Sequence, residues 1–484
     1  MHAIRILGAA SLSLFAAAAA EPIGLHPDNP HYFSFRGKPT VLITSAEHYG
    51  AVLNGDFDFV RYLDTLKAAG LNLTRTFAGV YYEVPGDFGI ARNTLAPKPS
   101  RFVGPYARST AKGALDGLNK FNLDRWNAAY FDRLKRFLRA ASDRGIVVEL
   151  TLFCVYYSDR MWNLSPLNPS NNTSGMAAIP REEVLAMKHP GMVAVQEAFV
   201  RKIVQETREF DNVLYEICNE PYIRGLAADD WQSHIAKVIR QAEESLAPPQ
   251  RHLTGWNAAN FARKIDAPDP NVSYYAFHYA RPPVTVAQNY SLARPIGMNE
   301  TGFDGTLDAV YRMQAWDFLM AGGAMYNNLD YSFTAGNEDG AFPVPGNSPG
   351  GGSAELRLQL RVLADFFAGL DFVKMRPAND LVTGGLPGGY AARALEQPGQ
   401  AYAVYVHSGR VMEGYRPRYV YRTGKTSFPI SLNLPAGKWR ARWTNTRTGK
   451  VDHEENFEHP GGHAWVPSPE FTEDIALVVA RRDP

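Results

Sequence analysis

Apolar and polar residues alternate along this chain with two different periods. Short apolar runs rich in β-branched and aromatic residues are followed by longer stretches in which apolar residues recur every three or four positions. The first pattern favours buried strands and the second favours amphipathic helices, and their alternation is typical of a parallel α/β fold. The clearest helix is expected at 124–144, and eight strands are expected at 41–45, 71–77, 146–153, 213–218, 251–256, 272–278, 295–299 and 323–329.

Eight strands that alternate with helices predict a (β/α)8 barrel, also called a TIM barrel. In such barrels the functional groups collect at the carboxyl ends of the strands. Loops 78–122 and 157–190 are too long to be plain connectors, and segment 337–352 is rich in glycine and proline. All three segments follow predicted strands, so we expect them on the functional rim of the barrel.

The pattern changes on either side of the barrel segment. Residues 32–39 predict a small hairpin that would cover the barrel floor. Beyond residue 376, alternating strands are separated by glycine-containing turns, which predicts a small C-terminal all-β sandwich domain. We therefore divide the chain into a barrel with its hairpin (21–375) and a sandwich (376–484). The stretch 434–449 of the sandwich contains two tryptophans. It is compatible with two roles of the sandwich, carbohydrate binding and structural support of the barrel.

The first twenty residues predict a cleaved signal peptide. Arg5 provides a positive start, residues 6–17 are apolar, and three alanines precede Glu21. We expect a secreted or periplasmic protein, with an uncleaved amino-terminal anchor as the alternative. No later segment reaches the roughly 18 uninterrupted apolar residues of a membrane span, so we expect no membrane partner.

Charge and composition narrow the function further. The 50 basic and 49 acidic residues nearly cancel, which leaves no electrostatic footprint for nucleic acid. The 24 tyrosines and 8 tryptophans would suit stacking on sugars, although a large core would also need them. For Cys154 and Cys218, buried free thiols are favoured over a disulfide bridge. No metal-binding motif is present in the sequence, so we expect no cofactor and no metal. We expect a monomer.

Two glutamates lie where predicted apolar strands end. Glu220 follows the run at 213–218 within Asn219-Glu220-Pro221, and Glu300 follows the run at 295–299. An ionised glutamate buried without partners costs several kcal/mol, so each should lie at the barrel mouth or be held there for a purpose. Pro221 leaves open that Glu220 caps the next helix. A pair of carboxylates at strand ends is what hydrolysis of a glycosidic bond requires.

These motifs resemble those of clan A glycoside hydrolases, (β/α)8 retaining enzymes that include the family 5 cellulases and mannanases. In that clan an Asn-Glu pair ends strand four and supplies the acid/base, and a second glutamate ends strand seven as the nucleophile. Glu220 and Glu300 match these positions by strand count. The resemblance covers roughly residues 30–371. It implies retaining hydrolysis of β-glycosidic bonds in a polysaccharide or oligosaccharide, with Glu220 as acid/base and Glu300 as nucleophile.

The resemblance also implies a set of substrate-binding residues. Arg75 matches the arginine of strand two, although an ordinary rim salt bridge is the alternative. Asn219 would contact the sugar 2-hydroxyl group. His278 and Tyr279 resemble the His and Tyr near the nucleophile, although in many family 5 members that Tyr lies two residues after the His, where this chain has Ala280.

Other candidates follow from their positions at predicted strand ends or in rim loops. Glu47 and His48 would bind a substrate hydroxyl group or form a loop hydrogen-bond network. Strand three lacks the His and strand eight the Trp that family 5 members usually carry; strand eight instead contains Tyr326. Asp330 and Glu338 are the rival acids. The candidate aromatic platforms for sugar are Trp256, Trp162, Tyr81 and Tyr82.

The alternative to an enzyme is a non-catalytic carbohydrate-binding protein on a decayed barrel. A decayed site should have lost at least one of Glu220, Glu300, Arg75 and Asn219, and the chain retains all four. This argues for the enzyme.

Overall fold

The structure is a computed structural model that describes residues 21–246, 251–412 and 418–482. The expected signal peptide, 1–20, lies outside the described residues. Within these residues, no helix has both the length and the apolar character needed to cross a membrane.

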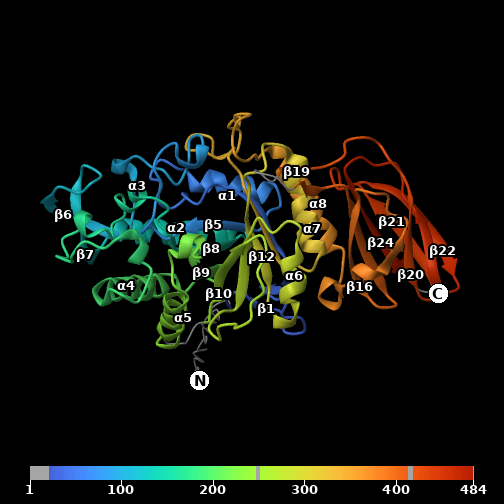
Figure 1. Cartoon of the computed structure of the whole chain (residues 1–484), viewed down its shortest axis with the longest axis horizontal. Coiled ribbons are helices and arrows are strands. Elements are labelled where there is room, and N and C mark those ends of the chain that lie inside the picture. The colour runs from blue at the N-terminus through green and yellow to red at the C-terminus, as the bar shows by residue number, and fades with distance from the viewer. Residues whose placement is uncertain (1–20, 247–250, 413–417, 483–484) are drawn as a thin grey trace, which may run out of the picture.

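Eight parallel strands form the barrel that the sequence predicts (Figure 1). From β8 onward, each barrel strand lies beside the barrel strand that precedes it in the chain, and the last strand, β13, lies beside the first, β4. The order is β4-β13-β12-β11-β10-β9-β8-β5. The bounds of these strands are β4 Leu42–Ala46, β5 Leu73–Phe77, β8 Val147–Cys154, β9 Val213–Asn219, β10 Thr254–Asn260, β11 Tyr274–His278, β12 Ile296–Thr301 and β13 Met325–Leu329.

A side chain helps to close the barrel between its first two strands, β4 and β5. The backbone N–H of Asn72, just before β5, donates to the carbonyl of Ile43 at 3.2 Å. The Asn72 side chain accepts from the Ile43 N–H at 2.8 Å and donates to the Val41 carbonyl at 2.8 Å. The side-chain amide of Asn72 therefore links β4 and β5, which are not joined by regular backbone pairing.

Helices surround the barrel, and two predicted boundaries are wrong. Residues 124–126 belong to a strand instead of the helix, because they end the second strand of a rim hairpin, in which Trp126 pairs with Tyr106 and stacks on it with ring centroids 5.1 Å apart. Strand five begins and ends later than expected and includes polar Asn257 and Asn260, which face the barrel mouth. The helices are α1 Phe59–Ala68, α2 Ala128–Asp143, α3 Asp159–Trp162, α4 Pro190–Thr207, α5 Asp229–Glu244, α6 Val284–Asn289, α7 Asp308–Met320 and α8 Ala354–Ala368.

The predicted rim loops contain short elements of their own. The loop after β5 forms a hairpin of β6 (Tyr106–Lys112) and β7 (Asn119–Trp126). Single 3-10 turns occur in this and other loops, at Asp87–Gly89, Pro99–Arg101, Pro169–Asn171, Arg181–Glu183, Ile223–Gly225, Tyr290–Leu292, Phe372–Lys374 and Asn379–Leu381.

The amino-terminal segment covers the barrel floor as predicted. Its three strands are β1 (Gly24–Leu25), β2 (Phe33–Phe35) and β3 (Lys38–Thr40). Phe33 packs edge-on against Tyr274 at the start of β11, with ring centroids 6.2 Å apart. The floor is therefore sealed at the amino ends of the strands, and the opposite end remains for a site.

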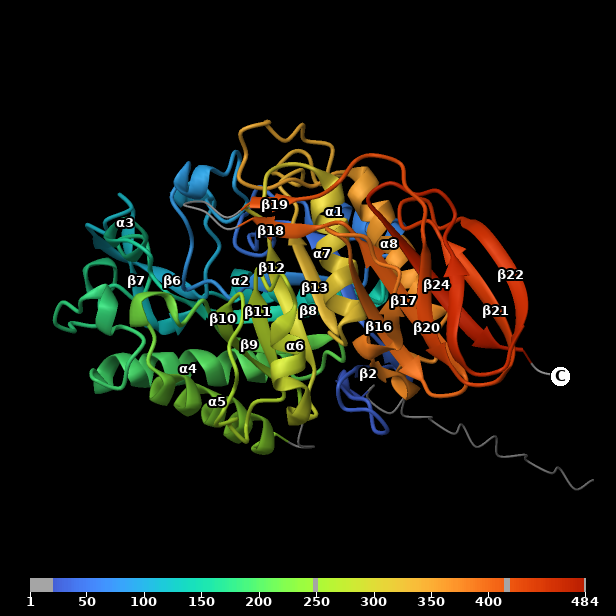
Figure 2. The same ribbon diagram turned by 45° about the vertical axis from the view of Figure 1, so that its right-hand side comes forward.

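The C-terminal part consists of two antiparallel sheets that enclose a second core with Trp439 and Trp443 fully buried. A hairpin of β18 (Arg410–Met412) and β19 (Arg418–Val420) reaches from these sheets to the barrel, where Tyr419 packs against the barrel core (Figure 2). The larger sheet contains β14 Arg376–Pro377, β16 Ala391–Gln397, β17 Ala401–His407, β24 Asp474–Arg481, β21 Gly437–Thr444 and β22 Val451–His459, and the smaller one β15 Val382–Gly384, β20 Pro429–Leu434 and β23 Gly462–Pro467.

The two parts share a buried polar interface next to α7. Arg312 of α7 donates to Asp474 of β24 at 2.6 Å, and Tyr405 of β17 donates to the same carboxylate at 2.9 Å. Trp316 stacks on Tyr405, with ring centroids 5.3 Å apart. These contacts favour the supporting role of the C-terminal domain that the sequence left open.

We expect the change Asp474→Ala to destabilise the protein by about 3–5 kcal/mol, because it leaves the buried guanidinium of Arg312 with less compensation. Urea unfolding measures the loss. The matched control is Asp132→Ala, which removes an exposed carboxylate paired with Arg136 and should cost about 0.5 kcal/mol or less. Equal effects of the two changes would contradict a buried ionic interface.

Candidate active site

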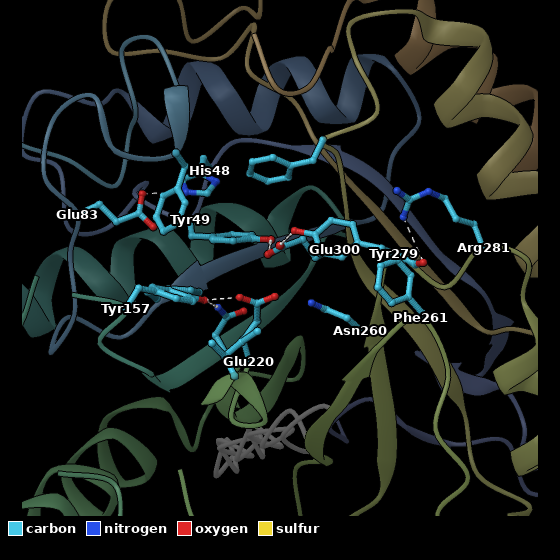
Figure 3. A pocket seen from close by; sticks show the side chains of 15 residues that line it. His48, Tyr49, Glu83, Tyr157, Glu220, Asn260, Phe261, Tyr279, Arg281 and Glu300 are labelled. Atoms are coloured by element: carbon cyan, nitrogen blue, oxygen red, sulfur yellow. Dashed lines mark hydrogen bonds and ion pairs between the residues drawn. The ribbon is translucent and has the colours of Figure 1, made fainter. Parts of the chain in front are cut away.

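A single pocket at the carboxyl ends of the strands contains both predicted glutamates (Figure 3). Its volume is about 360 Å³. Glu300 lies in β12, and Glu220 directly follows β9. The lining residues are His48, Tyr49, Phe77, Glu83, Phe88, Tyr157, Asn219, Glu220, Ile223, Asn260, Phe261, Tyr279, Arg281, Glu300 and Phe303.

The two carboxylates face each other across His278. One oxygen of Glu220 and one of Glu300 lie within 4.8 Å of each other. The Nδ1 atom of His278 lies 3.2 Å from Glu220 and 3.4 Å from Glu300. The structure therefore brings together three residues that the sequence predicts for the site.

Tyrosine hydroxyl groups hold both carboxylates. Tyr157 donates to Glu220 at 2.5 Å, whereas Tyr49 and Tyr279 donate to the two oxygens of Glu300 at 2.6 and 2.5 Å. Figure 3 shows these hydroxyl groups pointing at the carboxylates from opposite sides of the pocket. Glu300 thus receives two tyrosine hydrogen bonds and Glu220 one.

Glu300 is held in its ionised form. Burial alone would raise the pKa of Glu300, but the nearby charges of His278 and Arg75 and the hydrogen bonds from Tyr279 and Tyr49 outweigh this effect and lower the pKa to about 2. The reverse holds for His278: burial lowers its pKa, but the negative charges of Glu300 and Glu220 raise it above the ordinary value. His278 and Glu300 therefore stabilise each other's charged forms.

Arg75 lies beneath the pocket and is fully buried. Its guanidinium donates to Glu300 at 3.3 Å, to Glu216 at 2.5 Å and to Asn219 at 2.7 Å. Arg75 is therefore no rim salt bridge. It connects the nucleophile candidate on β12 with the Asn219 side chain at the end of β9.

A third carboxylate, Glu149 of β8, completes this buried cluster. Its Oε2 lies 3.4 Å from Nε of Arg75, and it accepts hydrogen bonds from Tyr274 at 2.8 Å and from Asn299. Burial, together with the negative charge of Glu216, raises the pKa of Glu149 to about 7. One guanidinium thus faces three carboxylates, and Glu149 retains a proton more readily than Glu300.

The pocket also concentrates backbone strain. Among the described residues, ten non-glycine residues have φ between 48° and 65°, and six of these line the pocket. Such left-handed conformations cost on the order of 1–3 kcal/mol each and cluster at functional sites. Glu220 itself has φ of 48°, and its backbone N–H is held by the side chain of Asn257 at 3.0 Å. The pocket residues are Tyr49, Phe88, Glu220, Phe261, Tyr279 and Phe303.

Glu47 and His48, which follow the first barrel strand, take different roles of the two that the sequence left open, substrate binding and a loop hydrogen-bond network. His48 lines the pocket, where its Nε2 atom pairs with Glu83 at 3.1 Å. Glu47 instead accepts from the backbone N–H groups of Gly50 and Ala51, both at 2.9 Å, and from Thr94. His48 can therefore meet a substrate hydroxyl group, whereas Glu47 fixes the loop.

Two predicted binding residues lie away from the pocket. Trp256 borders a separate surface cavity, because alternation along β10 turns it away from the face that holds Asn257. Tyr326 faces the helix layer and donates to the carbonyl of Tyr311 in α7 at 2.8 Å. Neither side chain lies in the pocket that contains Glu220 and Glu300, contrary to what the sequence predicts.

The rival acids and the loop platforms have structural roles. Asp330 is paired with Arg357 at 2.6 Å, and Glu338 accepts from the backbone N–H groups of Asp58 and Gly336. The remaining platform candidates are at most 5% exposed and therefore cannot present a ring to a sugar; they are Tyr81, Tyr82 and Trp162.

Sequence reasoning missed Tyr157 and the phenylalanines of the mouth. Tyr157 follows strand three, where the predicted long loop begins, and it accepts from Asn219 while donating to Glu220. Its position three residues beyond the end of β8, at the carboxyl end of the barrel, was the available indication. No comparable pattern marks Phe88, Phe261 or Phe303, whose placement depends on loop conformation.

Glu220, His278 and Glu300 are close enough to act as ligands of a metal ion. Their carboxylate oxygens already accept hydrogen bonds from tyrosine hydroxyl groups, which suits acid–base and nucleophilic chemistry better. Cys154 and Cys218 are both buried free thiols, as expected.

The fold has clear counterparts among solved structures. A putative glycoside hydrolase from Bacteroides vulgatus matches with a TM-score of 0.63 at 14% identity, over 96% of this chain and 82% of the other. This chain therefore shares its fold with a protein described as a putative glycoside hydrolase. A family 5 glycoside hydrolase from the same organism matches with a TM-score of 0.61 at 14% identity, over 95% and 93% of the two chains. Another structure described as a glycoside hydrolase gives 0.62 at 14% identity, over 95% and 97%. No protein-family model and no curated protein sequence matches the chain.

We predict that Glu149 makes stability depend on pH. Its folded pKa of about 7 lies above the ordinary value of 4.5, so the folded protein holds a proton that the unfolded chain releases. This stabilisation is complete below about pH 4.5 and is lost as the pH rises through about 7. Between pH 5 and 8 the free energy of unfolding should fall, and Glu149→Gln should remove on the order of 2 kcal/mol of that fall.

Urea unfolding at both pH values measures the difference between the variant and the wild type. Glu355→Gln, at an exposed position in the first turn of α8, is the matched control and should retain the wild-type pH dependence. The same pH dependence in Glu149→Gln and wild type would show that Glu149 is already ionised in the folded protein.

Proposed function

We propose that this protein is a retaining β-glycosidase with Glu300 as nucleophile and Glu220 as acid/base. The observation that carries the proposal is that one carboxylate oxygen of Glu220 and one of Glu300 lie within 4.8 Å of each other at the barrel mouth. Retaining enzymes need a separation of about 5–5.5 Å, whereas inverting enzymes need about 6.5–9.5 Å to admit a water molecule. The fold shared with glycoside hydrolases supports the same reaction class.

The environments of the two glutamates suit different steps. Ionised Glu300 attacks the anomeric carbon, and the bond between that carbon and the leaving oxygen breaks as Glu220 transfers a proton to this oxygen. Water then attacks the glycosyl-enzyme ester, Glu220 takes the proton, and Glu300 is released as a carboxylate. Arg75 and His278 stabilise the carboxylate of Glu300, while Tyr157 and Asn219 flank Glu220.

The protein is further proposed to act outside the cytoplasm as a monomer, after removal of residues 1–20. The basis is the charged, apolar and small-residue pattern of these residues. Mass spectrometry of protein recovered from the periplasm or medium should find Glu21 at the amino terminus, and sedimentation should give the mass of one chain.

The first test is stereochemical. A screen of aryl β-glycosides and β-linked oligosaccharides identifies the sugar, and NMR of the earliest product identifies its anomer. We expect the β-anomer to form first, because two displacements at one carbon restore its configuration. An α-anomer as first product would rule out the retaining reaction.

Two alanine variants separate the roles of the glutamates. Glu300→Ala should lower kcat by about 10⁴-fold or more, and Glu220→Ala should lower it by about 10²–10⁴-fold on poor leaving groups. With an activated aryl glycoside and azide, Glu220→Ala should recover turnover and give the β-glycosyl azide, because azide attacks the glycosyl-enzyme without a base. Glu300→Ala should give the α-glycosyl azide by a single displacement.

The matched control is Glu338→Gln, which changes a buried glutamate outside the pocket and should retain wild-type kcat. Exchange of the two azide products between the variants would reverse the assignment. Wild-type turnover in Glu300→Ala would exclude it as nucleophile and would revive the non-catalytic binding barrel as an explanation.

A further inference from the structure

The pocket has a polar interior and an apolar mouth. The interior presents the two glutamates together with His48, Glu83 and Asn219. The mouth is formed largely by three phenylalanines, Phe88, Phe261 and Phe303, which we call the phenylalanine rim. Apolar atoms make up the greater part of the pocket surface.

The phenylalanine rim is exposed to solvent. Phe88, Phe261 and Phe303 are 40%, 52% and 41% exposed, respectively. Exposed apolar surface costs about 25 cal/mol for each Å² that remains in water. A single exposed phenylalanine needs no explanation, but a group around one cavity marks a binding surface.

The backbone at all three positions is strained. Their φ angles are 58°, 65° and 59°, a region that a bulky side chain rarely adopts. Glycine or asparagine would meet these conformations at lower cost. Three segments far apart in the sequence, after β5, β10 and β12, thus each place a phenylalanine at the same mouth in an unfavourable conformation.

The rim lies directly outside the tyrosines that hold the carboxylates. Phe88 packs edge-on against Tyr157, with ring centroids 5.3 Å apart, and Tyr157 donates to Glu220. Phe261 and Phe303 lie beside Tyr279, with ring centroids 6.5 and 6.1 Å from its ring, and Tyr279 donates to Glu300. If the sugar occupies the polar interior, the group attached to it through the scissile oxygen extends outward between these rings.

The charged residue at the mouth is already paired. Arg281 forms an ion pair with Asp304 at 2.5 Å. Its guanidinium also lies 5.9 Å from the centre of the Phe261 ring (Figure 3). Sugar hydroxyl groups need hydrogen-bond partners as well as an apolar face. The phenylalanine side chains offer the face without the partners, and the oxygen of the lining amide Asn260 already accepts from Tyr222 at 2.7 Å. The pocket of about 360 Å³ is near the lower end of the roughly 300–1,000 Å³ of ligand sites.

We propose that the leaving group of the substrate is apolar, so that the protein hydrolyses β-glycosides of aromatic or other hydrophobic alcohols in preference to sugar chains. This inference rests on the proposed glycosidase activity and narrows its substrate class. The polar interior holds one sugar, and the phenylalanine rim holds the apolar alcohol that Glu220 protonates as it leaves.

The test compares leaving groups of similar chemical reactivity. For the sugar found in the screen, kcat/KM is measured for the 2-phenylethyl β-glycoside, the methyl β-glycoside and a β-linked disaccharide. Since both alcohols are unactivated, a difference between them reports on contacts with the rim. We expect kcat/KM to be about 10–100-fold higher for the phenylethyl glycoside than for the methyl glycoside, and higher than for the disaccharide.

The variants Phe88→Asn, Phe261→Asn and Phe303→Asn, singly and combined, remove the apolar surface. Asparagine tolerates positive φ, so these changes do not endanger the fold. The ratio of kcat/KM for phenylethyl over methyl glycoside should fall towards one in the triple variant. The matched control is Trp465→Thr on β23, which removes an aromatic side chain that is 61% exposed outside the pocket and should leave the ratio unchanged.

The outcomes separate this inference from the proposed function. Turnover with a ratio near one, or with the disaccharide preferred, would overturn the apolar leaving group while retaining the glycosidase. A triple variant that keeps the wild-type ratio would also overturn it. Failure of the wild type to hydrolyse any glycoside would remove the glycosidase and the inference together.

Discussion

The site depends on one buried guanidinium. Arg75 has no exposed surface, and its hydrogen bonds and ion pairs join β5 to β8, β9 and β12 through Glu149, Glu216 and Glu300. A buried charge of this kind is stable only when partners and hydrogen bonds compensate its desolvation. The barrel satisfies this condition by presenting carboxylates to Arg75 from three other strands. The position of Glu300 is consequently set by the barrel itself, whereas the loops contribute the remaining contacts.

Three carboxylates around one guanidinium leave an excess of negative charge, and the structure distributes it unevenly. Glu149 is fully buried and has a pKa raised to about 7. Glu300 lies 3.4 Å from His278. The charges of His278 and Arg75, with two tyrosine hydrogen bonds, lower its pKa to about 2. Glu220 is outside the reach of Arg75 and is held by Tyr157 and His278. Different surroundings of two carboxyl groups are what allow an acid and a nucleophile to coexist at one pH.

The barrel and its glutamates could be predicted from the sequence because strand periodicity and strand ends determine them. Glu220, Glu300, Arg75, Asn219 and His278 all belong to or directly follow barrel strands. Trp256 was misplaced because its strand begins and ends later than the apolar run suggests, so the run did not reveal which face the ring occupies. The phenylalanine rim could not be predicted, since a left-handed backbone at a phenylalanine contradicts local preference and is imposed by the surrounding fold.

The strained backbone at the mouth and the charged groups in the interior both bear on how much water the pocket holds. Electrostatic attraction between Arg75, His278 and Glu300 strengthens as the surroundings become less polar. An apolar leaving group seated on the phenylalanine rim would displace water from the mouth and close the pocket above the two carboxylates. The substrate itself would then complete the low-dielectric environment in which charge separation between Glu220 and Glu300 is most effective. With such a substrate, the leaving group would take the place of a lid, and the strained backbone at Phe88, Phe261 and Phe303 would be the structural cost of holding the surface that receives it.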